Sequence, residues 1–282
     1  MALATALPVY AATTIIVTPA NTQGWSTADT RPGGTVTFVV DPTSPAPNGA
    51  LQLTTDATTT AKAQYLHNTN TSLSSVVDLS YYTKQVFGSS VADPAYQLVV
   101  CLNGVTSTGC KPNLAPPPVS SFTTLVFEPY QNLGNNGNAA IVPNVWQKWN
   151  VSAGLFWSTR TVTCSNGVIA GTPGGPASYT LAQIKAVCPD AVVVQYGINI
   201  GSNNPSYVVR TDLFNFNGTI YNFEVTNVPT DKKQCKSGGY VNYTDANGNP
   251  FANQGQCIAF VEGAQNKNDN QGSGDNNNSH ND

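Results

Sequence analysis

Three carboxylates stand in or beside segments that have the residue pattern of β-strands. Glu128 ends the run from Phe122 to Phe127, whereas Asp212 and Glu224 belong to a predicted terminal hairpin. Carboxylates on neighbouring strands hydrolyse glycosidic bonds when they lie roughly 5 to 9.5 Å apart. Glu128 with Glu224 or Asp212 is therefore the candidate catalytic set. Pro129 follows Glu128 directly. We therefore favour the interpretation that these residues are carboxylates at turns or sheet edges over the catalytic one.

Aromatic side chains offer a second kind of chemistry, since the apolar faces of sugar rings stack on flat rings. Strand alternation predicts that Trp149, which shares its parity with Val145 and Val151, lies in the core and that Trp146 lies on the opposite face. Packing in the core is the competing interpretation for every ring. The candidate ligand-binding residues are Trp146, Tyr82, Trp157 and Trp25.

Aspartates suggest a calcium site, because calcium prefers carboxylate and carbonyl oxygens. The candidate ligands are Asp29, Asp41 and Asp212. Strand parity puts Asp212 on the face of Phe214 and Phe216, and a buried carboxylate there needs a partner. Calcium, a salt bridge to Arg210 or Arg31, and a bulge that turns Asp212 outward are the alternatives.

The stretch from Ala191 to Val225 predicts three consecutive strands. Alternating residues from Val192 to Ile200 have the period of a strand with one buried face. Asn217-Gly218 is the strongest short-range hairpin signal, because a type I′ turn needs positive φ at both central residues. We expect Phe216 to pair with Thr219 and Phe214 with Tyr221.

Strand-like runs and turn signals recur along the chain at the spacing of an all-β sandwich, and one segment, Tyr179 to Cys188, has the pattern of a short helix. We expect a signal-peptide remnant (1–12), a β-sandwich (13–226), a linker (227–231), a Cys-bounded module (232–262) and a disordered Asn/Asp-rich tail (263–282).

Composition points to a protein that works outside cells. Charged residues are 10% of the chain and the net charge is −3, without a basic cluster, which argues against nucleic-acid partners. No stretch has the length of a membrane span. Six cysteines in an exported chain favour local disulfides, whereas the scarcity of histidine argues against zinc. The expected pairs are Cys101 with Cys110, Cys164 with Cys188, and Cys235 with Cys257.

Two parts of the chain resemble known proteins. The segments Lys233–Tyr243 and Phe251–Val261, with their Cys-Lys-Ser-Gly-Gly-Tyr and Asn-Gln-Gly-Gln-Cys motifs, resemble a C-terminal module of secreted bacterial proteins. The region from Thr13 to Glu224 is similar in strand rhythm to concanavalin-like and carbohydrate-binding jelly rolls, with local likeness at Asn144–Val151 and at Asp212.

These resemblances imply a secreted or cell-surface jelly-roll sandwich that binds or adheres without catalysis, with a glycan or cell-surface polymer as partner. A polysaccharide-acting hydrolase or lyase and a structural cell-envelope protein are the alternatives.

Overall fold

A computed structural model describes residues 12–46, 48–88, 91–102, 110 and 122–270. The chain divides into two compact units, residues 1–17 with 22–224 and residues 18–21 with 225–282. The predicted signal-peptide segment lies outside the described residues, apart from residue 12. None of the described helices combines the length and the apolar character that crossing a bilayer requires.

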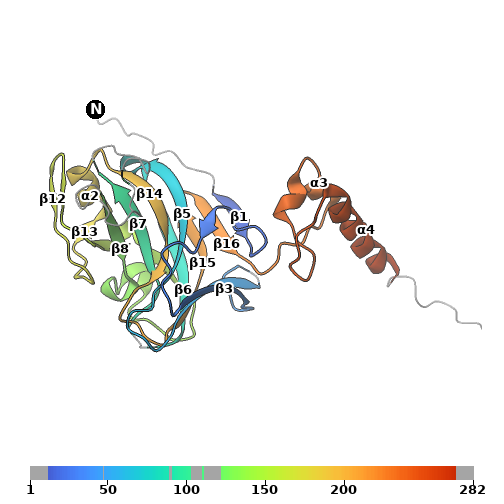
Figure 1. Cartoon of the computed structure of the whole chain (residues 1–282), viewed down its shortest axis with the longest axis horizontal. Helices are drawn as coiled ribbons and strands as arrows, with labels where there is room; N and C mark the ends of the chain where they lie inside the picture. Colours follow the sequence, from blue (N-terminus) through green and yellow to red (C-terminus); the bar gives the residue numbers. More distant parts are fainter. Residues whose placement is uncertain (1–11, 47, 89–90, 103–109, 111–121, 271–282) are drawn as a thin grey trace, which may run out of the picture. The chain divides into compact units, whose positions relative to one another are not determined.

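The first unit is a sandwich of two seven-stranded sheets, here called sheet A and sheet B (Figure 1). In sheet A, β15 pairs along its length with β6 and, on its other edge, with β4 and then β16. The strands of sheet A are β1 (Thr13–Val17), β16 (Thr219–Phe223), β15 (Val208–Phe216), β4 (Gly49–Thr55), β3 (Gly34–Val40), β6 (Leu79–Phe87) and β9 (Gln147–Asn150).

Sheet B forms the other layer. In spatial order its strands are β13 (Tyr179–Thr180), β10 (Leu155–Ser158), β8 (Phe122–Phe127), β7 (Ala95–Cys101), β14 (Val192–Ile200), β5 (Ala63–Ser72) and β2 (Trp25–Ser26). A separate ribbon consists of β11 (Val162–Cys164) and β12 (Gly167–Ile169). These two layers confirm the predicted all-β jelly-roll sandwich.

The short helices lie in the connections. The predicted helix is present as α2 (Leu181–Val187), and a capping box between Thr180 and Gln183 starts it. The described part of the sandwich also has four 3₁₀ turns: η1 (Leu73–Ser75), η2 (Pro129–Gln131), η3 (Asn135–Gly137) and η4 (Val151–Ala153).

An aromatic core joins the two sheets, and Trp25 lies at its centre. The Trp25 ring is 2% exposed, stacks on Tyr65 at 5.3 Å between centroids, and meets Phe214 edge-on at 5.2 Å. It also meets Tyr221 and Phe223 edge-on. The prediction that Trp25 binds a ligand is therefore wrong, because the short strand β2 turns its ring into the core.

The terminal hairpin has the predicted register, with Phe216 opposite Thr219 and Phe214 opposite Tyr221. A bulge between Asp212 and Asn215, with Leu213 at φ 47°, reverses the side-chain alternation within β15. Asp212 consequently shares the outer face of sheet A with Arg210, while Phe214 remains in the core. The bulge explains why Asp212 does not share the apolar face of Phe214 and Phe216, where strand parity had placed it.

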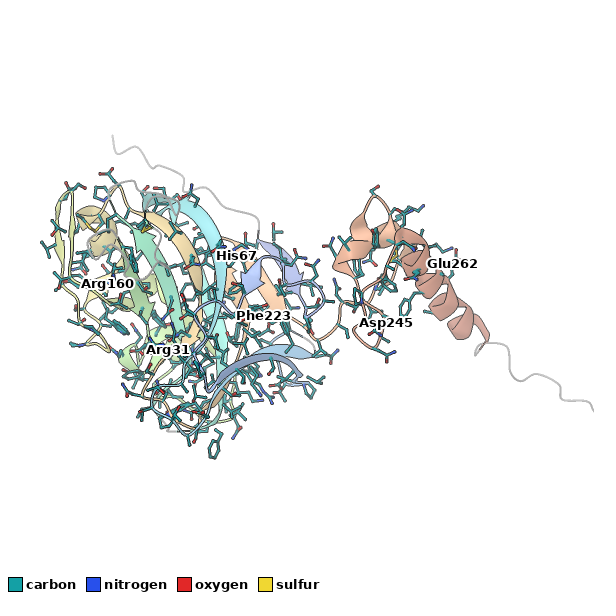
Figure 2. The ribbon with its side chains drawn as sticks, in the orientation of Figure 1. Arg31, His67, Arg160, Phe223, Asp245 and Glu262 are labelled. Atoms are coloured by element: carbon teal, nitrogen blue, oxygen red, sulfur yellow. A yellow bond between two sulfur atoms is a disulfide. The ribbon has the colours of Figure 1, made fainter. Side chains whose placement is uncertain are left out.

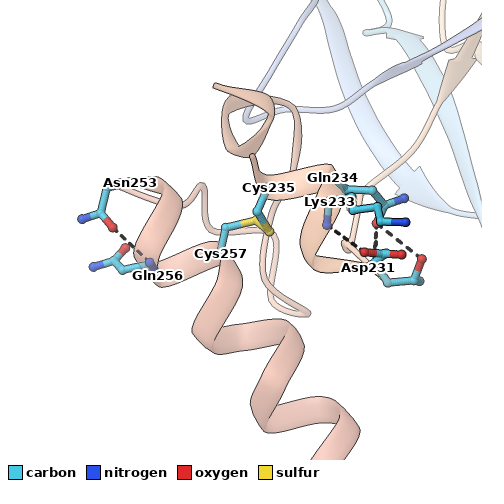
Figure 3. Close-up of a disulfide and its surroundings, with 8 residues drawn as sticks. Asp231, Lys233, Gln234, Cys235, Asn253, Gln256 and Cys257 are labelled. Carbon is cyan, nitrogen blue, oxygen red and sulfur yellow. Dashed lines mark hydrogen bonds between the residues drawn. A yellow bond between two sulfur atoms is a disulfide. The ribbon is translucent and has the colours of Figure 1, made fainter. Parts of the chain in front are cut away.

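All three predicted disulfides are present: Cys101–Cys110, Cys164–Cys188 and Cys235–Cys257. The last one joins α3 (Lys232–Cys235) to α4 (Gln254–Asn270) in the second unit, which also contains η5 (Gly239–Asn242) (Figure 3). Phe251 and Phe260 pack beside it with ring centroids 5.4 Å apart. Helix α4 extends into the segment from 263 that the sequence predicted to be disordered; residues 271–282 lie outside the described residues.

Trp25→Ala should destabilise the sandwich by about 3 to 5 kcal/mol, because it removes a fully packed indole from the centre of the core. Urea unfolding measures the loss. Phe87→Ala is the control, since Phe87 is 64% exposed and its removal should change the free energy of unfolding by no more than about 0.5 kcal/mol. Equal losses in the two variants would contradict the central place of Trp25.

Candidate functional site

Strand alternation decides which side chains of sheet B face outward. On β7, Tyr96 and Leu98 point into the core, so Gln97 and Val99 point away from it. The register continues this outer face onto β14, where Gln97 lies opposite Gly197 and Val99 opposite Gln195. The outward amides Gln64, Gln97, Gln195 and Asn199 are here called the amide face.

The amide face is unusual because its side chains are polar, are less than a tenth exposed and lie on the central strands of a sheet. Asn199 Nδ2 donates to Gln64 Oε1 at 3.0 Å, and Gln195 Nε2 donates to Asn68 Oδ1 at 2.9 Å. The Gln97 side chain makes no hydrogen bond to any described residue, and its amide atoms are not fully enclosed by protein. Its amide therefore reaches solvent and is free to bind a ligand.

Two hollows border the amide face, and each has at least one of its amides in the lining. The larger one, of about 320 Å³, is here called the glutamate hollow, and its lining includes Glu128, Asp93, Tyr130 and Asn199. The smaller one, of about 220 Å³, is here called the arginine hollow. Its lining is Asp29, Lys62, Gln64, Gln97, Val99, Phe122, Thr124, Thr159, Arg160 and Gln195. The hydrogen bond between Asn199 and Gln64 joins the linings of the two hollows.

Glu128 is held firmly at the wall of the glutamate hollow. Its Oε2 accepts hydrogen bonds from Trp157 Nε1 at 2.9 Å and from Gln131 Nε2 at 2.6 Å. Burial raises the pKa of Glu128, and the hydrogen bonds only partly oppose this. Trp157, a predicted ligand-binding residue, thus lies on the outer side of sheet B, where it packs on Ala95 and Val126 and orients Glu128.

Asp93 is a second carboxyl group in the lining of the glutamate hollow, and sequence reasoning missed it. Burial raises the pKa of Asp93 to about 8. Its Oδ2 accepts a hydrogen bond from the Thr83 hydroxyl, which in turn accepts one from Trp149 Nε1 at 2.8 Å. Its Oδ1 is enclosed and has no partner among the described residues. The only local signal is an Asp-Pro step before β7, which is typical of a turn.

The predicted catalytic pair is not assembled as one site. Glu128 follows β8 of sheet B, whereas Asp212 and Glu224 belong to the end of sheet A. Burial, together with the charge of the nearby Asp212, raises the pKa of Glu224 to about 7. Asp212 is fully buried and accepts hydrogen bonds from Ser44 Oγ at 2.6 Å and from the Phe223 amide at 3.0 Å. Neither residue lines either hollow.

The predicted aromatic set is divided as well. Tyr82 and Trp146 lie on the outer face of sheet A, while Trp149 is fully buried, as strand parity predicted. Lys148 Nζ lies 5.7 Å from the centroid of the Tyr82 ring, and Lys84 Nζ lies 5.8 Å from that of Trp146. Tyr82 and Trp146 therefore cannot act in one site with Trp157 on sheet B.

The three predicted calcium ligands do not converge. Asp41 already pairs with Lys84 at 3.0 Å and with Arg210 at 2.8 Å, whereas Asp29 lines the arginine hollow on sheet B. Burial alone would raise the pKa of Asp41, but hydrogen bonds from Thr43, Arg210 and Lys84 hold it well below its usual value. Within the described part of the chain, no three His, Cys, Asp or Glu residues are grouped to hold a metal. Calcium binding stays a prediction, and the three predicted ligands do not form one site for it.

Comparison with known proteins gives only distant structural likeness. No protein-family model matches the chain, and no curated protein matches it in sequence. A family 11 carbohydrate-binding module of a cellulosomal cellulase of Clostridium thermocellum aligns at 12% identity and a TM-score of 0.35, over 68% of this chain and 86% of that one. The Clostridium thermocellum family 11 module in complex with a β-1,3-1,4-mixed-linked tetrasaccharide aligns at 14% identity and a TM-score of 0.36. The alignment covers 71% of this chain and 91% of that one.

Asp93→Asn should remove part of the pH dependence of stability. Because the folded state raises the pKa of Asp93 from 3.8 to about 8, its protonated form stabilises the fold at low pH, and this contribution is lost as pH rises through that window. The wild type should lose stability relative to the variant by up to about 1.4 kcal/mol per pH unit. Urea unfolding across the window measures this; parallel curves for the two proteins would contradict it.

Proposed function

We propose that this protein is a secreted, non-enzymatic module that binds glycan on the outer face of sheet B. The observation that carries the proposal is the amide face, with the two hollows beside it. The larger hollow has the size of sites that hold small ligands, which span roughly 300 to 1,000 Å³.

Amide side chains suit sugar hydroxyls because each amide offers both a donor and an acceptor, as each hydroxyl does. Gln64 and Gln195 are anchored through one end of the amide by Asn199 and Asn68 respectively, so the other end is held in place for a ligand. Strands of a packed sheet position these groups rigidly, which reduces the entropy lost on binding.

The carboxyl groups of the glutamate hollow favour a binding role over hydrolysis. Hydrolysis needs an acid and a second carboxylate that both reach the scissile bond. One oxygen of Glu128 is held by Trp157 and Gln131, and the unpartnered oxygen of Asp93 is enclosed by protein. We therefore assign Glu128 to ligand binding and Asp93 to the support of the hollow.

An extracellular location fits the covalent structure. The three disulfides form and persist in oxidising compartments. A cell-surface polymer or a free polysaccharide is the partner that such a module would meet there.

Gln97→Leu should weaken glycan binding at least about tenfold, the effect of losing roughly 1.4 kcal/mol of hydrogen bonding to the ligand. No hydrogen bond between described residues is lost with the Gln97 amide, so the fold should be retained. A glycan array identifies the ligand, and titration calorimetry on the hit measures the change.

Trp146→Ala on sheet A is the control and should leave the affinity unchanged. A protein that binds no glycan on the array would overturn the proposed function. Affinity lost in Trp146→Ala but retained in Gln97→Leu would move the binding face to sheet A.

A further inference from the structure

We propose that the arginine hollow binds the anionic group of an acidic sugar residue, either the carboxylate of a uronic acid or a sulfate ester. This inference rests on the proposed glycan-binding function and names the class of glycan. It follows from the unpaired cations of the hollow.

Arg160 is the first of these cations. Among the three arginines of the chain, Arg31 donates to Ser202 Oγ at 2.8 Å, and Arg210 pairs with Asp41. The Arg160 guanidinium has no hydrogen bond or ion pair to any described residue, and its Nη1 is enclosed without a partner. It lies over the Phe122 ring, 4.1 Å from the centroid. Figure 2 shows Arg160 on the side of the sandwich that sheet B forms.

An unpaired guanidinium at a partly buried site is costly for the fold, because its hydration is reduced and no acceptor replaces the lost water. The cation–π contact with Phe122 restricts where the guanidinium can move. Arginine presents a rigid fork of donors that matches the two oxygens of a carboxylate, and more loosely those of a sulfate. The geometry is that of an anion-binding group without its anion.

Lys62 is the second cation of the arginine hollow. Burial lowers the pKa of Lys62, while Asp29 acts in the opposite direction. Lys62 has no ion pair within 4.0 Å among the described residues, so Asp29 does not neutralise it by direct contact. Two cations against one carboxylate leave this hollow cationic in a chain whose net charge is −3.

The remaining lining explains why the anion should be carried by a sugar. Gln97 and Gln195 line the same hollow as the two cations, and Thr124 and Thr159 belong to the lining as well. The glutamate hollow, whose lining holds Glu128 and no lysine or arginine, offers the same anion no positive charge. An acidic glycan would therefore bind in one direction, with its charged residue in the arginine hollow.

The test is titration calorimetry of the full chain with three sets of oligosaccharides: oligogalacturonates and other polyuronates, sulfated galactans, and uncharged glucans of similar length. The wild type should bind at least one acidic set at least about tenfold more tightly than the uncharged set. Arg160→Met should remove this preference, so that the acidic set binds no more tightly than the uncharged set. Arg160→Lys should retain part of it for sulfate and less for carboxylate, because the ammonium lacks the planar fork.

Lys148→Met is the matched control, since it removes one positive charge from the outer face of sheet A and should not change the preference. Lys62→Met offers a second variant in the hollow if Arg160→Met fails to fold, as judged by thermal melting. Equal binding of acidic and uncharged glycans would overturn the inference and leave the proposed function intact. Binding of none of the three sets would overturn both.

Discussion

The aromatic core between the two sheets is the constraint on which the rest of the structure depends. Trp25, Tyr196 and Phe214 pack so closely that the inner face of every neighbouring strand is fixed. Strand alternation then leaves only the other face of each strand for function. Because Tyr96 and Ile198 must point inward, Gln97 and Asn199 must point outward. The amide face is thus a consequence of how the core is packed.

The outer face of sheet B differs in character from that of sheet A. On sheet A the charged groups are paired: Asp41 is shared by Lys84 and Arg210, and Asp212 is held by Ser44. On sheet B the amide of Gln97 and the guanidinium of Arg160 have no partner among the described residues. An enclosed guanidinium nitrogen without an acceptor is costly, so Arg160 together with the open amide of Gln97 indicates where a ligand would complete the hydrogen bonding.

Local sequence patterns predicted the sheet framework well and the site poorly. The Asn217-Gly218 turn set the hairpin register, and local spacing gave the three disulfides. The bulges in β14 and β15 could not be located, because a single extra residue reverses parity without a clear sequence signal. Trp25 was misassigned because a two-residue strand in a turn-rich segment is too short to show an alternation of buried and exposed residues. The amide face unites residues from β5, β7 and β14, and only the pairing of distant strands brings them together.

The most direct measurement of the central claim is a nuclear magnetic resonance titration of the isotopically labelled protein with the oligosaccharide that it binds. Side-chain amide signals of Gln64, Gln97 and Gln195 and the Nε signal of Arg160 should shift with ligand, while signals from β6 and β9 stay in place. Shifts confined to Tyr82, Lys148 and their neighbours on sheet A, with the amide face unchanged, would contradict the account.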